Sequence, residues 1–200
     1  MSNCGLHCLK INHITVAIGG SILLRDVCLH AHCGELTALI GRNGAGKSTT
    51  LKMILGLVRP TAGSIQVLGK EMDAKNRLAV LRQVGSLIES PSYYGHLTGE
   101  ENLRIVQMLR GVPEKNIREA LQIVRLDGQR GKKVAHYSLG MKQRLGIATA
   151  LLGSPKLLIL DEPTNGLDPA GIQEMRSLIA AMPESTGATV LISSHLLGEM

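Results

Sequence analysis

Eight consecutive residues near the start of the chain have the composition of a phosphate-binding loop. They are rich in glycine and end in a lysine and a serine: Gly41, Arg42, Asn43, Gly44, Ala45, Gly46, Lys47 and Ser48. Glycines let backbone N–H groups turn inward onto phosphate oxygens, and a following helix presents its positive end. In this pattern the lysine reaches the β- and γ-phosphates, and the serine hydroxyl ligates Mg²⁺. The motif predicts a nucleoside triphosphate site, with Thr49 at its edge.

Two acidic residues late in the chain supply the second half of such a site. Asp161 and Glu162 directly follow an apolar run at residues 156–160, which we expect to be a buried strand. Ligands of parallel sheets bind at the carboxyl ends of the strands, so both acids are expected to face the phosphate loop. We predict that Asp161 holds the Mg²⁺ shell and that Glu162 polarises the attacking water.

The elements that must position these groups alternate between strands and helices. Residues 9–29 contain apolar runs on both sides of Gly19-Gly20, which predicts a hairpin of two strands. Residues 72–133 are rich in helix formers and basic side chains, and predict a helical subdomain. Further strands are expected at 36–40, 64–68, 156–160 and 189–193, and helices at 47–58, 141–152 and 170–182. The alternation predicts an α/β fold with a mostly parallel sheet covered on both faces.

Composition limits the class of protein. The 200 residues are 44% hydrophobic and 19% charged, which suits one folded domain. The net charge of +6 favours anionic partners. Phe and Trp are absent and Tyr occurs three times, so most of the stacking platforms of single-stranded nucleic-acid binders are missing. We therefore expect no direct nucleic-acid partner.

The apolar runs bear on the compartment. None approaches the roughly 18 residues that a membrane span needs, and the first nine residues do not form a signal segment. These features predict a cytosolic chain whose four cysteines remain reduced.

Three further motifs complete a recognisable series. Ser138 and Gly140 lie where a helix is expected to begin, residues 165–168 read Asn-Gly-Leu-Asp, and His195 follows the strand expected at 189–193. Together with the phosphate loop and the acid pair, they make the chain from about residue 9 onward resemble the nucleotide-binding domain of ABC transporters.

The resemblance implies a P-loop NTPase that hydrolyses Mg-ATP. It implies one domain over residues 1–200: a nucleotide-binding core at 1–85 and 145–200 with an N-terminal antiparallel β subdomain, and a helical subdomain at 86–144 that ends in the signature motif. It also implies that the chain can lack C-terminal elements beyond residue 200. The catalytic residues would be Glu162, His195 and Lys47, with Asp168 in the neighbouring loop.

The resemblance further implies a dimer. Two ATPase domains, as a homodimer or a heterodimer, would close head to tail on two ATP molecules. Lys47, Ser48, Asp161, Glu162 and His195 would come from one copy, and Ser138 and Gly140 from the other.

Tyr137, Leu139 and Met141 depart from the commonest form of the signature motif, and two departures elsewhere matter more. Glu89 stands where the family usually has a glutamine, and Ile18 stands where an aromatic residue usually stacks on adenine. The segment around Glu89 is similar to the bacitracin-resistance and lantibiotic-immunity ABC exporters. That similarity implies a subunit at the cytoplasmic face of the membrane that powers export of an antimicrobial peptide or drug-like substrate through a separate transmembrane permease.

Two alternatives stay open. All four cysteines and four of the seven histidines precede the phosphate loop, and the soft ligands among them suit Zn²⁺. The segment also resembles ATPase subunits of metal-ion ABC transporters; the candidate ligands are Cys4, His7, Cys8, Cys28, His32 and Cys33, with His30 on the same strand face as Cys28 and His32. The second alternative is a soluble ABC ATPase acting on nucleic acid or ribosomes, which typically carries a coiled-coil insertion or a second cassette that is not present here.

Overall fold

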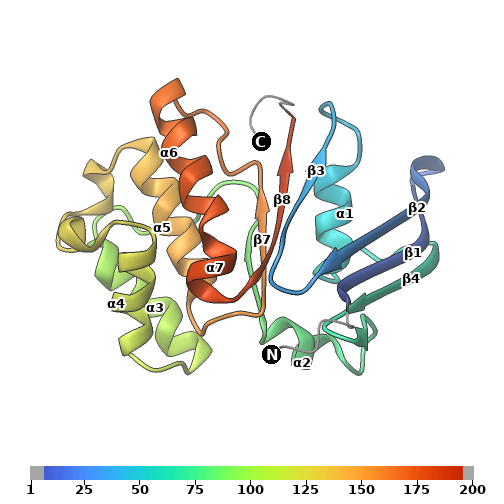
Figure 1. Ribbon diagram of the computed structural model, residues 1–200, viewed down its shortest axis with the longest axis horizontal. Coiled ribbons are helices and arrows are strands. Elements are labelled where there is room, and N and C mark those ends of the chain that lie inside the picture. The colour runs from blue at the N-terminus through green and yellow to red at the C-terminus, as the bar shows by residue number, and fades with distance from the viewer. Residues whose placement is uncertain (1–6, 196–200) are drawn as a thin grey trace.

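Two sheets and a layer of helices make up the fold (Figure 1). The computed structural model describes residues 7–195. An antiparallel sheet is separated from a parallel sheet by helix α1 (Lys47–Ile54), and the remaining long helices cover the opposite face of the parallel sheet. The predicted α/β architecture is confirmed.

The antiparallel sheet begins with the expected hairpin. β1 (His7–Ile18) and β2 (Ser21–His32) meet at Gly19 and Gly20, whose φ angles of 58° and 82° are those of a tight hairpin turn. β4 (Ala62–Val67) pairs with the other edge of β1, and the short β5 (Lys70–Glu71) pairs with β4. The resulting order is β2-β1-β4-β5.

The second sheet is entirely parallel in the residues described. Its order is β3-β8-β7-β6, formed by β3 (Leu36–Ile40), β8 (Thr189–Ser194), β7 (Leu157–Asp161) and β6 (Val84–Leu87). Every residue of β7 and β8 is buried. Such strands need helices on both faces, which explains their continuous apolar sequence.

The stretch at 72–133, predicted as a helical subdomain, also contains a strand of the parallel sheet, β6. Helix α2 (Arg77–Leu81) is only five residues long, and Val84–Leu87 pairs in parallel with β7. A four-residue strand has no alternation that distinguishes it from a helical turn, so its partner strand decides its conformation. The first helix also ends at Ile54 and not at residue 58, because Gly56 takes a φ of 64°.

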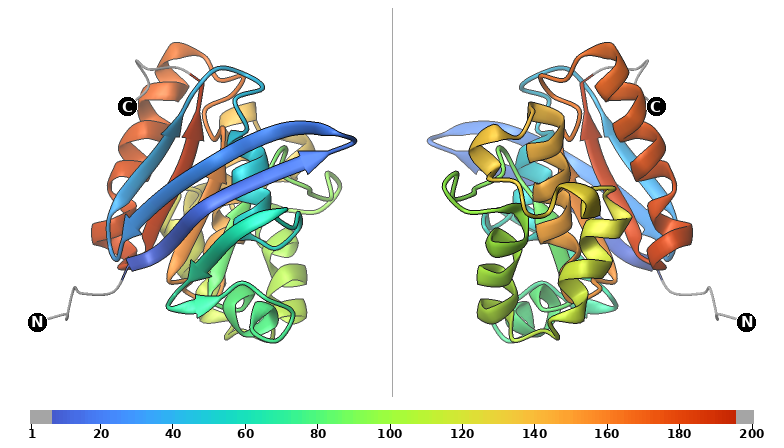
Figure 2. Two further views of the ribbon diagram at one scale, coloured as in Figure 1. Left: turned by 90° about the vertical axis from the view of Figure 1, so that its right-hand side faces the viewer. Right: turned by 90° about the vertical axis from the view of Figure 1, so that its left-hand side faces the viewer.

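The helical layer packs on one face of the parallel sheet (Figure 2). Leu158 and Leu160 of β7 face these helices, whereas Leu157 and Ile159 face α1 and the antiparallel sheet. One strand therefore contributes to both hydrophobic cores. The layer contains α3 (Gly99–Arg110), α4 (Lys115–Ile123), the 3₁₀ turns η1 (Asp127–Gln129) and η2 (Val134–His136), α5 (Leu139–Leu151), α6 (Pro169–Ala180) and α7 (Met182–Thr186).

Replacing Gly85 by alanine is expected to destabilise the fold. A Cβ atom at Gly85 would lie 2.0 Å from the carbonyl oxygen of Ala150 in α5, so β6 and α5 must separate to admit it. We expect a loss of about 2 kcal/mol or more in the free energy of unfolding, measured by urea titration. Gly131→Ala is the matched control, because a Cβ atom added at Gly131 would have nothing within 4 Å. Equal stability of the two variants would contradict the close packing of β6 on α5.

Candidate functional site

The phosphate loop joins the parallel sheet to α1. The N–H of Gly41, directly after β3, donates to the carbonyl oxygen of Ser194 at the end of β8 (3.2 Å). Gly44 and Gly46 have φ angles of 84° and 88°, which glycine adopts without strain. No side chain caps the first turn of α1, so its N–H groups remain available for an anion.

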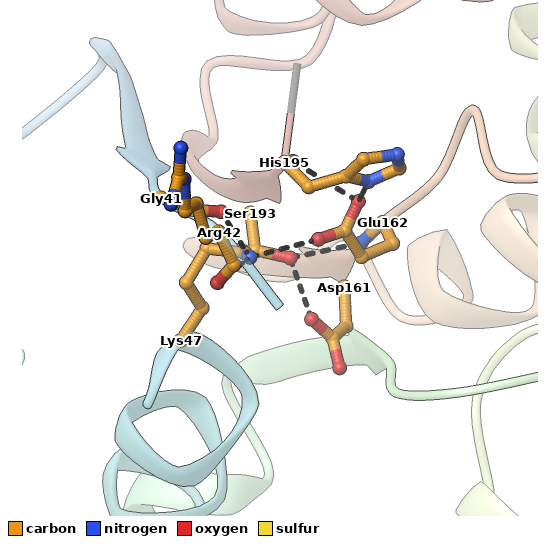
Figure 3. Close-up of polar contacts among 7 residues, drawn as sticks. All are labelled: Gly41, Arg42, Lys47, Asp161, Glu162, Ser193 and His195. Carbon is orange, nitrogen blue, oxygen red and sulfur yellow. Dashed lines mark hydrogen bonds and ion pairs between the residues drawn. The ribbon is translucent and has the colours of Figure 1, made fainter. Parts of the chain in front are cut away.

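Lys47 reaches back across this loop to Glu162, the residue directly after β7 (Figure 3). Its Nζ donates to the carbonyl oxygens of Gly41 (2.6 Å) and Arg42 (3.3 Å), and lies 3.2 Å from Oε1 of Glu162. The side chain is 8% exposed. The ammonium is thus held between the loop and the end of β7, where a triphosphate bound by the loop would place its terminal groups.

Asp161 is fixed by a serine that the sequence reasoning missed. The Ser193 hydroxyl donates to Oδ1 of Asp161 (2.5 Å) and accepts the backbone N–H of Glu162 (2.9 Å). Ser193 is opposite Asp161 in the parallel register of β8 and β7. Two features of the sequence indicate a role for Ser193. It lies near the end of the strand expected beside the one that carries Asp161, and it precedes His195 by two residues.

Glu162 lies between Lys47 and a histidine. His195 Nδ1 lies 2.6 Å from Oε2 of Glu162, and the His195 backbone N–H donates to the same oxygen (3.3 Å). Burial raises the pKa of the Glu162 carboxyl, but the contacts with His195 and Lys47 outweigh burial and hold the pKa below its ordinary value. Glu162 is therefore an ionised carboxylate at neutral pH. Its φ of 47° is unusual for a non-glycine residue and is typical of functional sites.

The residues at this edge of the sheet are suited to bind Mg²⁺ together with a nucleoside triphosphate. Ser48, in the first turn of α1, and Asp161, at the end of β7, provide a hydroxyl and a carboxylate. Oxygen ligands of this kind are those that Mg²⁺ prefers. The glycine-rich loop and the uncapped helix N-terminus supply the donors for phosphate oxygens. Asn43 and Ala45 lie in this exposed loop, and Thr49 lies in the first turn of α1.

Glu89 approaches the site from the fourth parallel strand. It follows the end of β6 by two residues, and its Oε1 accepts a hydrogen bond from Lys52 Nζ of α1 (2.8 Å). This hydrogen bond and the charge of Lys52 lower the pKa of the Glu89 carboxyl. Residues after all four parallel strands therefore gather at one edge of the sheet: the loop, Glu89, Asp161 with Glu162, and His195.

Ser138, Gly140 and Asp168 form a second cluster. Ser138 caps α5 by accepting the N–H of Met141 (3.3 Å), and Asp168 caps α6 by accepting the N–H of Gly171 (3.2 Å). All three residues line a surface depression of about 350 Å³, which no residue of the phosphate loop lines. The structure therefore places them apart from Lys47, as a surface that a second molecule can contact.

The predicted zinc site is not found within residues 7–195, where no three His, Cys, Asp or Glu side chains are grouped to hold a metal ion. Cys8 points into the core, and burial raises the pKa of its thiol to about 11. Cys28 and Cys33 are exposed, and the ring of His7 packs against those of His30 and His32. Strand alternation puts Cys8 on the buried face of β1, away from the rings of His7, His30 and His32. Cys4 and the side chain of Ile18 lie outside what the structure describes.

Comparison with known proteins places the chain among transporter subunits. The sequence profile of the ABC transporter family matches residues 24–165. The chain is 47% identical over 193 residues to the bacitracin transport ATP-binding protein BcrA of Bacillus licheniformis, which covers 96% of this chain and 63% of BcrA. It is also 47% identical over 192 residues to the lantibiotic transport ATP-binding protein SrtF of Streptococcus pyogenes, over 96% of this chain and 82% of SrtF. The chain thus spans slightly less than two thirds of BcrA.

Solved structures agree with these relatives. CbiO1 from Clostridium perfringens, part of the ABC transporter complex cbiONQ, superposes with a TM-score of 0.87 at 30% identity and covers 95% of this chain and 79% of its own. An ATP-binding subunit of another ABC transporter gives a TM-score of 0.79 at 36% identity, over 96% of this chain and 80% of its own. These likenesses confirm the predicted P-loop NTPase fold. With the profile covering most of the chain and the relatives nearly all of it, the protein belongs to the ABC transporter family.

Proposed function

We propose that this chain binds and hydrolyses Mg-ATP to power the export of an antimicrobial peptide or a similar drug-like molecule. The observation that carries the proposal is the chain of contacts from the phosphate loop through Lys47 and Glu162 to His195. It joins a cation suited to terminal phosphates with a base suited to water at the same edge of the sheet.

Each residue at this edge has a distinct task in the proposed reaction. Lys47 and the loop N–H groups bind the phosphates, and Ser48 with Asp161 would hold Mg²⁺, which would supply positive charge beside the γ-phosphoryl group. Glu162 accepts a proton from water as the water oxygen bonds to the γ-phosphorus and the bond to the ADP oxygen breaks. His195 keeps Oε2 of Glu162 oriented, and Ser193 keeps Asp161 in place.

The second cluster supports a composite site in a dimer. The N-terminus of α5 begins at Ser138, so its hydroxyl, its N–H groups and the positive end of the helix dipole suit the γ-phosphate held by another copy. Gly140 leaves the depression open, because only Leu167 lies within 4 Å of a Cβ built there. Two identical copies, or this chain with a similar one, would then complete two sites head to tail.

The relatives support the proposed substrate and location. BcrA is an ATP-binding protein of bacitracin transport, and SrtF is an ATP-binding protein of lantibiotic transport. Among the helices described here, none is long and apolar enough to cross a membrane. By analogy with these transport proteins, a separate permease would carry the peptide, with this chain bound to it at the cytoplasmic face of the membrane.

The two alternatives are not favoured. The metal-ion transporter was suggested mainly by the Cys and His residues, and among the described residues these form no metal-binding site. A soluble ATPase acting on nucleic acid or ribosomes has no relative among those described above. Bacitracin and lantibiotic transport proteins match 96% of the chain at 47% identity.

Glu162→Gln tests the assignment of the base. The amide keeps the size of the side chain but cannot accept the proton, so single-turnover hydrolysis of ATP is expected to slow by about a hundredfold or more while Mg-ATP still binds. Glu184→Gln, on the exposed surface of α7, is the matched control and should hydrolyse ATP at the parent rate. Hydrolysis by the Glu162 variant within threefold of the parent would exclude this residue as the base.

A mixing experiment tests the composite site. Ser138→Asp keeps a good helix cap but places a negative charge where the γ-phosphate of the partner copy is expected. Alone, this variant and Lys47→Ala should each be inactive. Mixed in equal amounts, about half of the dimers are mixed and each has one intact site, so roughly a quarter of the parent ATPase rate should return. A mixture as inactive as its components would contradict a site shared between copies.

A further inference from the structure

Lys52 is a charged residue beside the site, and the sequence motifs assign it no role. It lies in the last turn of α1 and donates a hydrogen bond from Nζ to Oε1 of Glu89, 2.8 Å away. Ser48 is four residues earlier on the same helix, so Ser48 and Lys52 share one helix face. The ion pair therefore links the segment after β6 to the face of α1 that carries the proposed Mg²⁺ ligand.

Two acids affect the pKa of Lys52. The hydrogen bond and charge of Glu89 raise the pKa of Lys52, and Asp161 adds a smaller effect of the same sign. Asp161 is the carboxylate that Ser193 fixes at the end of β7. The ammonium of Lys52 is therefore paired mainly with the Glu89 carboxylate, with which it makes its hydrogen bond.

The backbone at Glu89 is constrained. Its φ of 64° lies in the left-handed region, which a non-glycine residue adopts only when its surroundings hold it there. The side chain is 70% exposed and that of Lys52 is 34% exposed. Ion pairs this accessible to water contribute little to folding stability. The contact is thus better suited to placing a carboxylate than to holding the fold together.

The chain beyond Glu89 is fixed to the helical layer at its other end. Pro91 packs against Gly146 of α5, where an added Cβ would lie 2.7 Å from the Pro91 side chain. The ring of Tyr93 lies beneath Lys142 Nζ, 5.5 Å from the ring centre. Asn102 of α3 bonds both the N–H and the carbonyl oxygen of Tyr94 (2.7 and 3.1 Å). The segment is thus anchored on α3 and α5, and the hydrogen bond between Lys52 and Glu89 connects it to α1.

We propose that Lys52 is a positioning residue whose ion pair with Glu89 sets the place of the Glu89 carboxylate beside the Mg-ATP site. The inference rests on the proposed ATPase function and deepens it. Glu89 then acts on Mg-ATP from a fixed place, and loss of either partner removes the same interaction. Lys52 itself touches neither the phosphates nor the water.

A double-mutant cycle on Mg-ATP hydrolysis tests the pair. Lys52→Met and Glu89→Ala are each expected to lower kcat/KM by about tenfold, and the double variant should be no worse than the more impaired single variant, because both changes remove one interaction. Lys52→Arg should restore kcat/KM to within threefold of the parent, since its guanidinium can pair with the carboxylate. Lys115→Met on α4, whose Nζ lies 3.9 Å from Glu119, is the control for losing an exposed pair and should leave kcat/KM unchanged.

The outcomes separate the pair from the site itself. Strictly additive effects in the cycle, or no rescue by Lys52→Arg, would overturn the proposal for Lys52 while the ATPase function stands. If the single variants lose melting temperature in proportion to their loss of activity, the proposal is also overturned, because that result indicates that the ion pair stabilises the fold. A parent chain that neither binds nor hydrolyses Mg-ATP would instead refute the proposed function, and the Lys52 proposal with it.

Discussion

The parallel pairing of β3, β8, β7 and β6 is the constraint on which the site depends. Parallel strands end at the same edge, so four segments far apart in the sequence deliver their next residues to one place. The register puts Asp161 opposite Ser193, and the Ser193 hydroxyl then holds both Asp161 and the backbone of Glu162. A shift of either strand by one residue would reverse the inward and outward sides of its residues and dismantle this arrangement.

Charge balance at that edge follows from the same geometry. Lys47 faces Glu162, Lys52 faces Glu89, and His195 lies against Glu162. Uncompensated carboxylates this close would repel one another and take up protons. His195 and Lys47 hold the pKa of the Glu162 carboxyl below its ordinary value, and Lys52 does so for Glu89, because the helix that follows the phosphate loop carries both lysines. The position of one eight-residue helix thus sets both the phosphate-binding loop and the charge state of the acids.

The sequence predicted those features whose signals are local. The phosphate loop, the acids after β7, the hairpin at Gly19-Gly20 and the helix cap at Ser138 each depend on a few neighbouring residues, and the structure contains all four. β6, Ser193 and the Lys52 contact were missed because each is defined by a partner more than thirty residues away. The zinc prediction failed for a related reason: it counted ligand types along the chain, whereas alternation along β1 puts Cys8 in the core, away from the rings of His7, His30 and His32.

The central claim is that Lys47 binds the terminal phosphates of Mg-ATP, and calorimetry on the folded chain tests it most directly. The parent should take up Mg-ATP, and Lys47→Ala should weaken the affinity by about tenfold or more, since a charge-assisted contact to phosphate is lost. Lys70→Ala on the exposed strand β5 should bind like the parent. No uptake by the parent, or equal affinity of the Lys47 and Lys70 variants, would contradict the account.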